Sequence, residues 1–214
     1  MKNVIHSILV LLLILSVFGS DKYEKAMRAS IDKINECKTT ADFIRVANTF
    51  ERIAAAENDK WLPYYYSSFL YVLASYQDSS AEQKDIYLDK SDEFLAIADS
   101  LKSDNSEIYT LRGMIAQARM QIDPMNRWQK YGALANNNFQ KASEIDSLNP
   151  RPDYLIGIGI FYTPEQFGGG PVNAKPILEK SKMKYEQFVP ENDLMPTWGK
   201  ENVEQLLNQI DEKK

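Results

Sequence analysis

A pattern of small and large apolar residues recurs four times along the chain. In each copy a small or aliphatic residue stands four positions before a large apolar residue, and another small or aliphatic residue follows three positions later. The four copies are Val46/Phe50/Ile53, Ser91/Leu95/Ala98, Ala135/Phe139/Ala142 and Ala174/Leu178/Ser181. Spacings of four and three put each triplet on one face of a helix, and such repetition is typical of stacked helical hairpins. The sequence therefore predicts an all-α solenoid.

Helical periodicity continues between these copies. It predicts helices over residues 22–37, 40–57, 63–76, 81–101, 107–122, 125–145, 154–162, 172–188 and 198–210. Thr39 or Thr40 suits the N-cap of the second helix, and Ser80 with Gln83 forms a capping-box pattern before the fourth. No stretch shows sustained alternation with a period of two, so we expect almost no β-strand. The expected architecture is about four helical hairpins followed by a C-terminal capping helix.

The first twenty residues differ in composition from the rest of the chain. Lys2 provides a positive start, residues 4–18 are mostly apolar, and residues 17–20 offer a cleavage site. This pattern predicts a secretory signal peptide over residues 1–20 and a helical-repeat domain over residues 21–214. The apolar run of roughly 15 residues is shorter than the ~20 that cross a bilayer, so no membrane span is expected after cleavage; the alternative is an uncleaved anchor.

Cysteine usage narrows the expected location. A lipoprotein signal would place a cysteine directly after the small residues of the cleavage site, and the sequence has none there. Cys37 is the only cysteine, so it has no disulfide partner within the chain and suits a small buried apolar position; the alternative is a reactive thiol or an intermolecular bridge. We expect a bacterial protein that is periplasmic or secreted and carries no lipid anchor.

Charge and histidine content exclude several classes of function. The formal net charge is -5 and the basic residues are scattered, which disfavours a nucleic-acid partner. His6 is the only histidine and lies in the expected signal peptide, so the mature chain lacks Ser-His-Asp and Cys-His arrangements and ordinary histidine zinc sites. A pair of carboxylates could still act alone, but nothing singles out two of them. We therefore expect a protein that is not an enzyme and has no cofactor or metal.

The first helices of the expected hairpins carry a second pattern. Spacings of four and three recur in Tyr64/Ser68/Tyr71 and in Tyr109/Gly113/Ala116. Together with the triplets of the second helices, these residues make the chain resemble the tetratricopeptide repeat. The gaps between first and second helices are longer than in that family, and the proline that closes its repeats is mostly missing here. The likeness is therefore to a tetratricopeptide-like stack rather than to a regular array.

The resemblance implies a binding surface. In that family the inner faces of the first helices line a concave groove, and this register corresponds here to Tyr65, Phe69, Val72, Thr110, Met114 and Gln117. A groove of aromatic residues and methionine can hold a peptide or a helix of a partner protein. For Tyr65 and Phe69 the spacing fits a core position equally well. The function implied is a non-catalytic scaffold or assembly factor that binds a protein or peptide.

The segment Thr163–Gly170 is the most distinctive loop. Its three glycines could expose backbone N–H groups to a phosphate, but the segment lacks the Gly-Lys-Ser/Thr ending of a P-loop. The simpler interpretation is a tight connection that needs positive φ angles. The segment also resembles loops of tetratricopeptide proteins associated with periplasmic TRAP-type transporters. That likeness implies the alternative function, a small-solute-binding accessory subunit of a periplasmic transport system.

The C-terminal region matches a cap. Met195–Gly199 precedes an amphipathic stretch that carries apolar residues on one side, ending at Ile210. A solenoid exposes apolar surface at its end unless a further helix covers it. We expect this stretch to be the capping helix, with Trp198 as its wedge; the alternative is that Trp198 contacts a partner.

Overall fold

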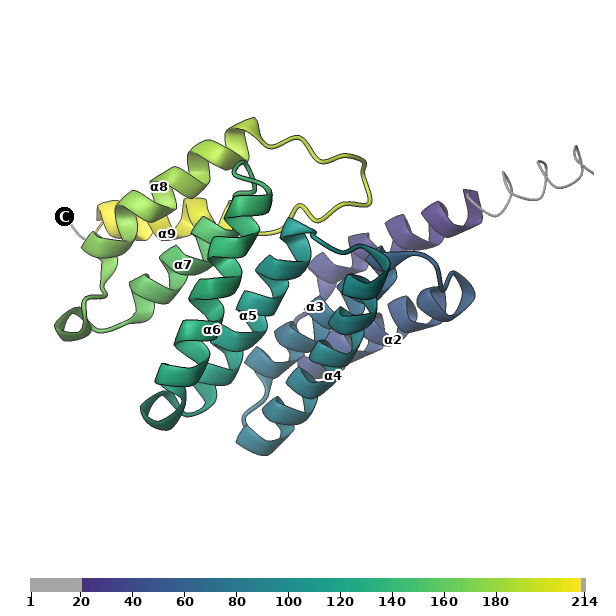
Figure 1. Ribbon diagram of the computed structural model, residues 1–214, viewed down its shortest axis with the longest axis horizontal. Coiled ribbons are helices and arrows are strands. Elements are labelled where there is room, and N and C mark those ends of the chain that lie inside the picture. The colour runs from purple at the N-terminus through teal and green to yellow at the C-terminus, as the bar shows by residue number, and fades with distance from the viewer. Residues whose placement is uncertain (1–20, 213–214) are drawn as a thin grey trace, which may run out of the picture.

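The computed structural model describes residues 21–212, and within that range it contains helices and loops but no β-strand (Figure 1). The expected signal peptide at residues 1–20 lies outside the described residues. The elements are a helix through residues 21–32, η1 (Lys33–Glu36), α2 (Thr40–Ala56), α3 (Trp61–Gln77), α4 (Ala81–Leu101), α5 (Ser106–Ile122), α6 (Pro124–Ile145), α7 (Arg151–Tyr162), η2 (Glu165–Phe167), α8 (Pro171–Gln187) and α9 (Lys200–Glu212). The all-α prediction is confirmed.

Consecutive helices pack as antiparallel hairpins that stack side by side in chain order (Figure 1). The pairs α3 with α4, α5 with α6 and α7 with α8 form three of the hairpins. The first helices of these hairpins also touch one another, α3 against α5 and α5 against α7. This arrangement gives the stack an inner layer of first helices and an outer layer of second helices, as expected for a helical solenoid.

The large residue of each repeated triplet lies in the core. Phe50, Leu95, Phe139 and Leu178 are all buried, as are the small residues Ala98, Ala135, Ala142 and Ala174. Gly113 on α5 shows why small residues are needed there, because a Cβ atom at this position would come within 2.3 Å of the Phe139 ring on α6. The pattern in the sequence is therefore a packing pattern between and within hairpins.

Local signals explain where the helices begin and end. Thr39 caps α2 through a complete capping box with Asp42, whereas the Ser80 hydroxyl accepts a hydrogen bond from the Gln83 N–H without a complete box. The last helix starts at residue 200 rather than at the predicted 198, because Gly199 has a φ of 106° that no helix allows. The 163–170 loop is a tight connection with positive φ, as predicted, at Gly168 and Gly170.

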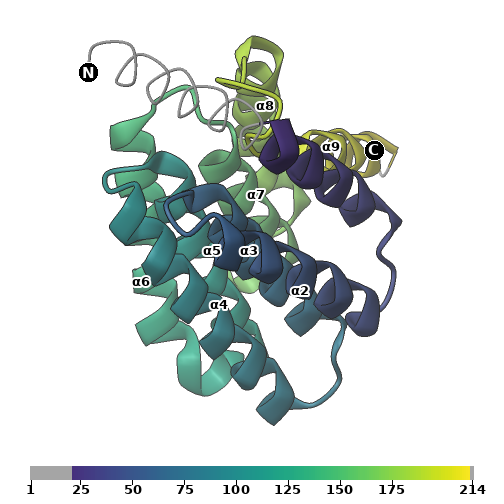
Figure 2. The same ribbon diagram turned by 90° about the vertical axis from the view of Figure 1, so that its right-hand side faces the viewer.

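The first described helix contacts the loop before α9. Figure 2 shows this helix, at residues 21–32, on the side of the molecule that faces the viewer, and in Figure 1 it lies toward the opposite end of the long axis from α9. Arg28 on this helix forms ion pairs with Glu24 and with Asp193, which belongs to the loop before α9. Val203, Leu206, Leu207 and Ile210 of α9 are buried, so this helix covers apolar surface at the end of the stack.

Two glycines in neighbouring helices should respond to alanine in opposite directions. We expect Gly113→Ala to destabilise the protein by about 1–3 kcal/mol, because the buried Phe139 ring has no room to move away. Gly132→Ala on α6 should stabilise it by about 0.5–1 kcal/mol, since its nearest neighbour would be Met120 Sδ at 3.7 Å and alanine is the better helix former. Urea unfolding monitored by circular dichroism measures both values. Destabilisation of similar size in the two variants would contradict the packing role of Gly113.

Candidate functional site

The six residues predicted to line an inner groove are buried in this structure. Gln117 is the most exposed of them, at 9%. Its side-chain amide donates a hydrogen bond of 2.8 Å to the Leu155 carbonyl on α7, and the Thr110 hydroxyl bonds to the Ser106 carbonyl of its own helix. Val72 and Met114 lie in the same core. The role of these six residues as a partner-binding surface stays a prediction.

The chain itself covers part of this inner face. The Trp198 ring stacks on Phe69 of α3 with 5.0 Å between ring centroids, and its indole N–H donates to the Tyr65 hydroxyl at 3.0 Å. The Tyr66 hydroxyl donates to the Leu194 carbonyl at 2.8 Å. The segment over residues 189–199, which we call the return segment, thus packs against the first helices. A partner could reach Tyr65 and Phe69 only if this segment moved.

A buried ion pair holds the return segment. Arg151, at the start of α7, is fully buried and lies 2.8 Å from the Glu107 carboxylate on α5. Its guanidinium also donates to the Pro196 carbonyl and lies between the rings of Phe188 and Trp198, at 4.8 and 5.4 Å from their centroids. Arginine suits this position because its planar group combines several hydrogen-bond donors with a face that stacks on aromatic rings.

The Glu107 carboxylate is surrounded by donors. The Asn149 amide donates to it at 2.8 Å, and the Tyr65 hydroxyl donates at 3.4 Å. Burial raises the pKa of Glu107 above its ordinary value, while the charge of Arg151 and these hydrogen bonds act in the opposite direction. Sequence reasoning missed this cluster because Glu107 and Arg151 are 44 positions apart and neither belongs to a recognisable motif.

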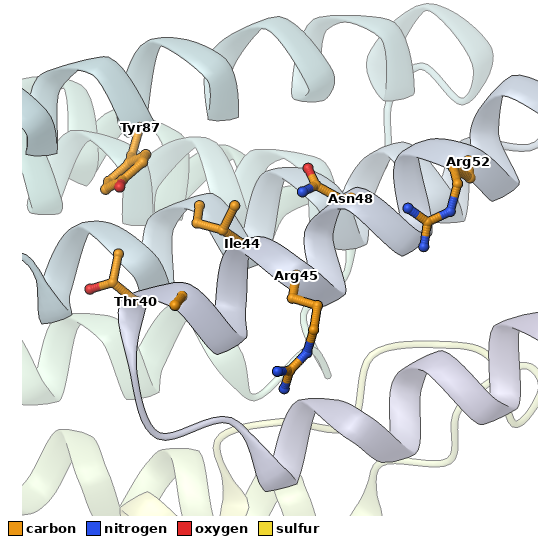
Figure 3. Close-up of a pocket in the computed structure, with 7 residues that line it drawn as sticks. Thr40, Ile44, Arg45, Asn48, Arg52 and Tyr87 are labelled. Carbon is orange, nitrogen blue, oxygen red and sulfur yellow. The ribbon is translucent and has the colours of Figure 1, made fainter.

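A groove of about 550 Å³ lies on the outer layer between α2 and α4 (Figure 3). We call it the outer groove. Tyr87 contributes the only side chain from α4, and the remaining lining comes from α2: Thr40, Ala41, Ile44, Arg45, Asn48 and Arg52. Volumes of about 300–1,000 Å³ are usual for sites that bind small molecules. The outer groove is therefore large enough for such a ligand.

The lining combines positive charge with apolar surface. Arg45 and Arg52 are seven residues apart on α2, which places them on one face about 10 Å apart along the axis. No acidic side chain belongs to the lining. Ile44 and the Tyr87 ring add apolar surface, and Tyr87 is itself stacked on Tyr71 with 6.3 Å between centroids. This chemistry suits a flat apolar molecule that carries acidic groups.

Sequence reasoning also missed the outer groove. The spacing of Arg45 and Arg52 is visible in the sequence, but it is common on exposed helix faces. The site needs Tyr87 as well, and that residue comes close to α2 because α2 and α4 both pack on α3. Over residues 21–212 the structure has no cluster of histidine, cysteine, aspartate or glutamate suited to a metal ion. Across the same residues, no helix combines the length and apolar character needed to span a membrane.

The comparison with solved structures decides the family. The HusA haemophore from Porphyromonas gingivalis superposes with a TM-score of 0.79 and 32% sequence identity, over 90% of this chain and 94% of the haemophore chain. The chain belongs to the HusA family. No protein-family model matches this HusA-family chain, and neither does any curated protein. The tetratricopeptide likeness therefore remains a resemblance in residue pattern.

The buried ion pair gives a stability prediction for this HusA-family chain. We expect Arg151→Ala to destabilise the protein by about 3–5 kcal/mol, because it leaves the Glu107 carboxylate buried without its cation. Arg112 is the matched control, since it also pairs with a carboxylate, Asp99 at 3.1 Å, but at a partly exposed position. Arg112→Ala should cost less than about 1 kcal/mol. Chemical unfolding measures both, and equal losses would show that burial of the first pair is unimportant.

Proposed function

We propose that this HusA-family chain is an exported, non-catalytic protein that binds haem. The observation that carries the proposal is the 32% identity to the HusA haemophore over 94% of that protein's chain. Similarity of this extent, rather than a shared fold alone, supports a shared class of ligand. The composition of residues 1–20 supports export, since it has the features of a secretory signal peptide.

The residue content agrees with a binding role. Residues 21–214 contain no histidine, so the general acid-base groups most common in enzymes are missing from them. The outer groove has no carboxylate in its lining, and a glycosidase-type mechanism needs two. These observations favour binding over catalysis.

The lack of histidine also limits how haem can be held. Tyrosine, methionine and cysteine are the remaining side chains in residues 21–214 that are known to ligate haem iron. A protein can also bind two other features of haem, the flat apolar faces of the porphyrin ring and the two propionate carboxylates. A site for haem in this chain should therefore combine aromatic or aliphatic surface with cationic side chains.

A small molecule is better supported as ligand than the peptide expected from the sequence. The peptide expectation depended on an open inner groove, and the return segment packs over part of that face with Trp198 stacked on Phe69. The outer groove remains accessible and has the volume of a small-molecule site. The sequence analysis also gave an alternative, a small-solute-binding accessory subunit. That alternative is closer to haem binding than the peptide-binding expectation is.

Haem titration of purified residues 21–214 tests the proposal. We expect a saturable change of the Soret absorbance with one haem per chain and a Kd on the order of 1 μM or tighter, which corresponds to about 8 kcal/mol. The control is the same titration in denaturant at a concentration that unfolds the chain, where saturation should disappear. A change that grows linearly with haem in both samples would contradict specific binding.

A thermal melt gives a second readout that is independent of haem absorbance. Ligand at 100 times its Kd should stabilise the folded state by about 2.7 kcal/mol, because it binds the native chain only. For a domain of this size that shift corresponds to a rise in Tm of about 5–10 °C. An unchanged Tm at saturating haem would argue against the proposed function.

A further inference from the structure

The outer groove offers cations that are available to a ligand. Across residues 21–212, Arg52 makes no ion pair with a carboxylate, and its guanidinium donates a hydrogen bond of 2.9 Å to the Thr49 hydroxyl. Arg45 pairs with Asp42 at 2.8 Å through a single nitrogen, which leaves further N–H donors of its guanidinium unused. Both arginines are exposed. In a chain with a net charge of -5, two such cations on one groove form a local site for a dianion.

The carboxylate that pairs with Arg45 is already engaged. Asp42 accepts hydrogen bonds from the Thr39 N–H and the Thr39 hydroxyl as part of the cap of α2. These hydrogen bonds lower the pKa of Asp42, so its carboxylate stays ionised and in place at neutral pH. Asp42 thus orients Arg45 and does not line the groove itself.

The apolar part of the groove lies beside the two cations. Figure 3 shows Ile44 on α2 with Tyr87 of α4 above it in the view, while the Arg45 side chain extends downward from α2. The Tyr87 ring is held by stacking on Tyr71, whose hydroxyl donates to Glu51 at 2.7 Å. An aromatic ring fixed in this way is a suitable surface for one face of a planar ligand.

We propose that the outer groove is the haem site, with Arg45 and Arg52 binding the two propionates and with the porphyrin ring lying on Ile44 and Tyr87. This inference rests on the proposed function. Arginine pairs with carboxylates through charge-assisted hydrogen bonds, and the two-turn spacing provides one guanidinium for each carboxylate. Neutral planar molecules lack these carboxylates, so the outer groove should bind them more weakly than haem.

The experiment combines a double variant with a modified ligand. Arg45→Gln/Arg52→Gln should weaken haem binding by about 10- to 100-fold, because each lost cation removes a charge-assisted contact at a solvent-exposed site. Haem dimethyl ester, in which both carboxylates are blocked, should bind the double variant and the unmodified chain equally. Soret titrations with both ligands give the four dissociation constants of the cycle.

A matched variant controls for net charge. Lys141→Gln/Lys182→Gln removes two exposed cations from α6 and α8 and should leave the haem affinity within about twofold. Thermal melts without ligand should agree among all these variants, because exposed substitutions change stability by less than about 0.5 kcal/mol.

A single added charge gives an independent test. Asn48 lines the groove between Arg45 and Arg52, so Asn48→Glu places a carboxylate where it pairs with both arginines and repels the propionates. We expect at least a tenfold loss of haem affinity, and no comparable loss in Asn137→Glu, which adds the same charge at an exposed position of α6.

The outcomes separate the two proposals. If the unmodified chain shows no saturable haem binding, the proposed function fails and this inference fails with it. If the unmodified chain binds haem and the Arg45/Arg52 and Asn48 variants bind it as tightly as their controls, the outer groove is overturned as the site while the proposed function stands. Loss of affinity in these variants, confined to the ligand with free carboxylates, supports the assignment.

Discussion

The Arg151–Glu107 ion pair is the interaction on which the inner side of this molecule depends. It joins α7 to α5, and the same guanidinium holds the Pro196 carbonyl and the ring of Trp198. A buried pair of this kind adds less net stability than its short distance suggests, because both charges lose their hydration. Its effect is instead on the position of the return segment, because the Arg151 guanidinium contacts Glu107, the Pro196 carbonyl and the Trp198 ring together only when the segment lies in this place.

That position determines which surface remains for a ligand. In a helical solenoid the concave side is the usual binding surface. Here Trp198 and Leu194 pack against Phe69 and Tyr66 on that side, so these two aromatic residues of α3 belong to the core. The outer groove between α2 and α4 keeps its cations exposed because second helices carry polar residues on the face that points away from the stack. The proposed haem site therefore lies on the opposite layer from the one that the repeat pattern favours.

Much of the fold could be predicted from the sequence, because helical-hairpin packing leaves a local and periodic trace. The triplets such as Ala135/Phe139/Ala142 lie at crossings between helices, and caps such as Thr39 have a short-range signature.

The sites could not be predicted in the same way. Tyr87 joins Arg45 and Arg52 only because α2 and α4 both pack on α3, and Arg151 meets Glu107 only through the stacking of two hairpins. In the sequence, Tyr65 and Phe69 fitted a groove position and a core position equally well. In the structure they are covered by Trp198, which lies more than 120 residues later in the chain.

The contacts of the early helices with the loop before α9 give this solenoid a property that open repeat arrays lack. In an open array each repeat touches only its neighbours, so terminal repeats can fray while the middle stays folded. Here Arg28, on the first helix described, pairs with Asp193, which is 165 positions later, and Tyr66 holds the Leu194 carbonyl. Such contacts across the whole sequence cost loop-closure entropy during folding and make the first and last hairpins lose their structure together. The molecule is built from repeats, yet it should unfold as one cooperative unit, and removal of the helix at residues 21–32 would loosen the loop before α9 as well.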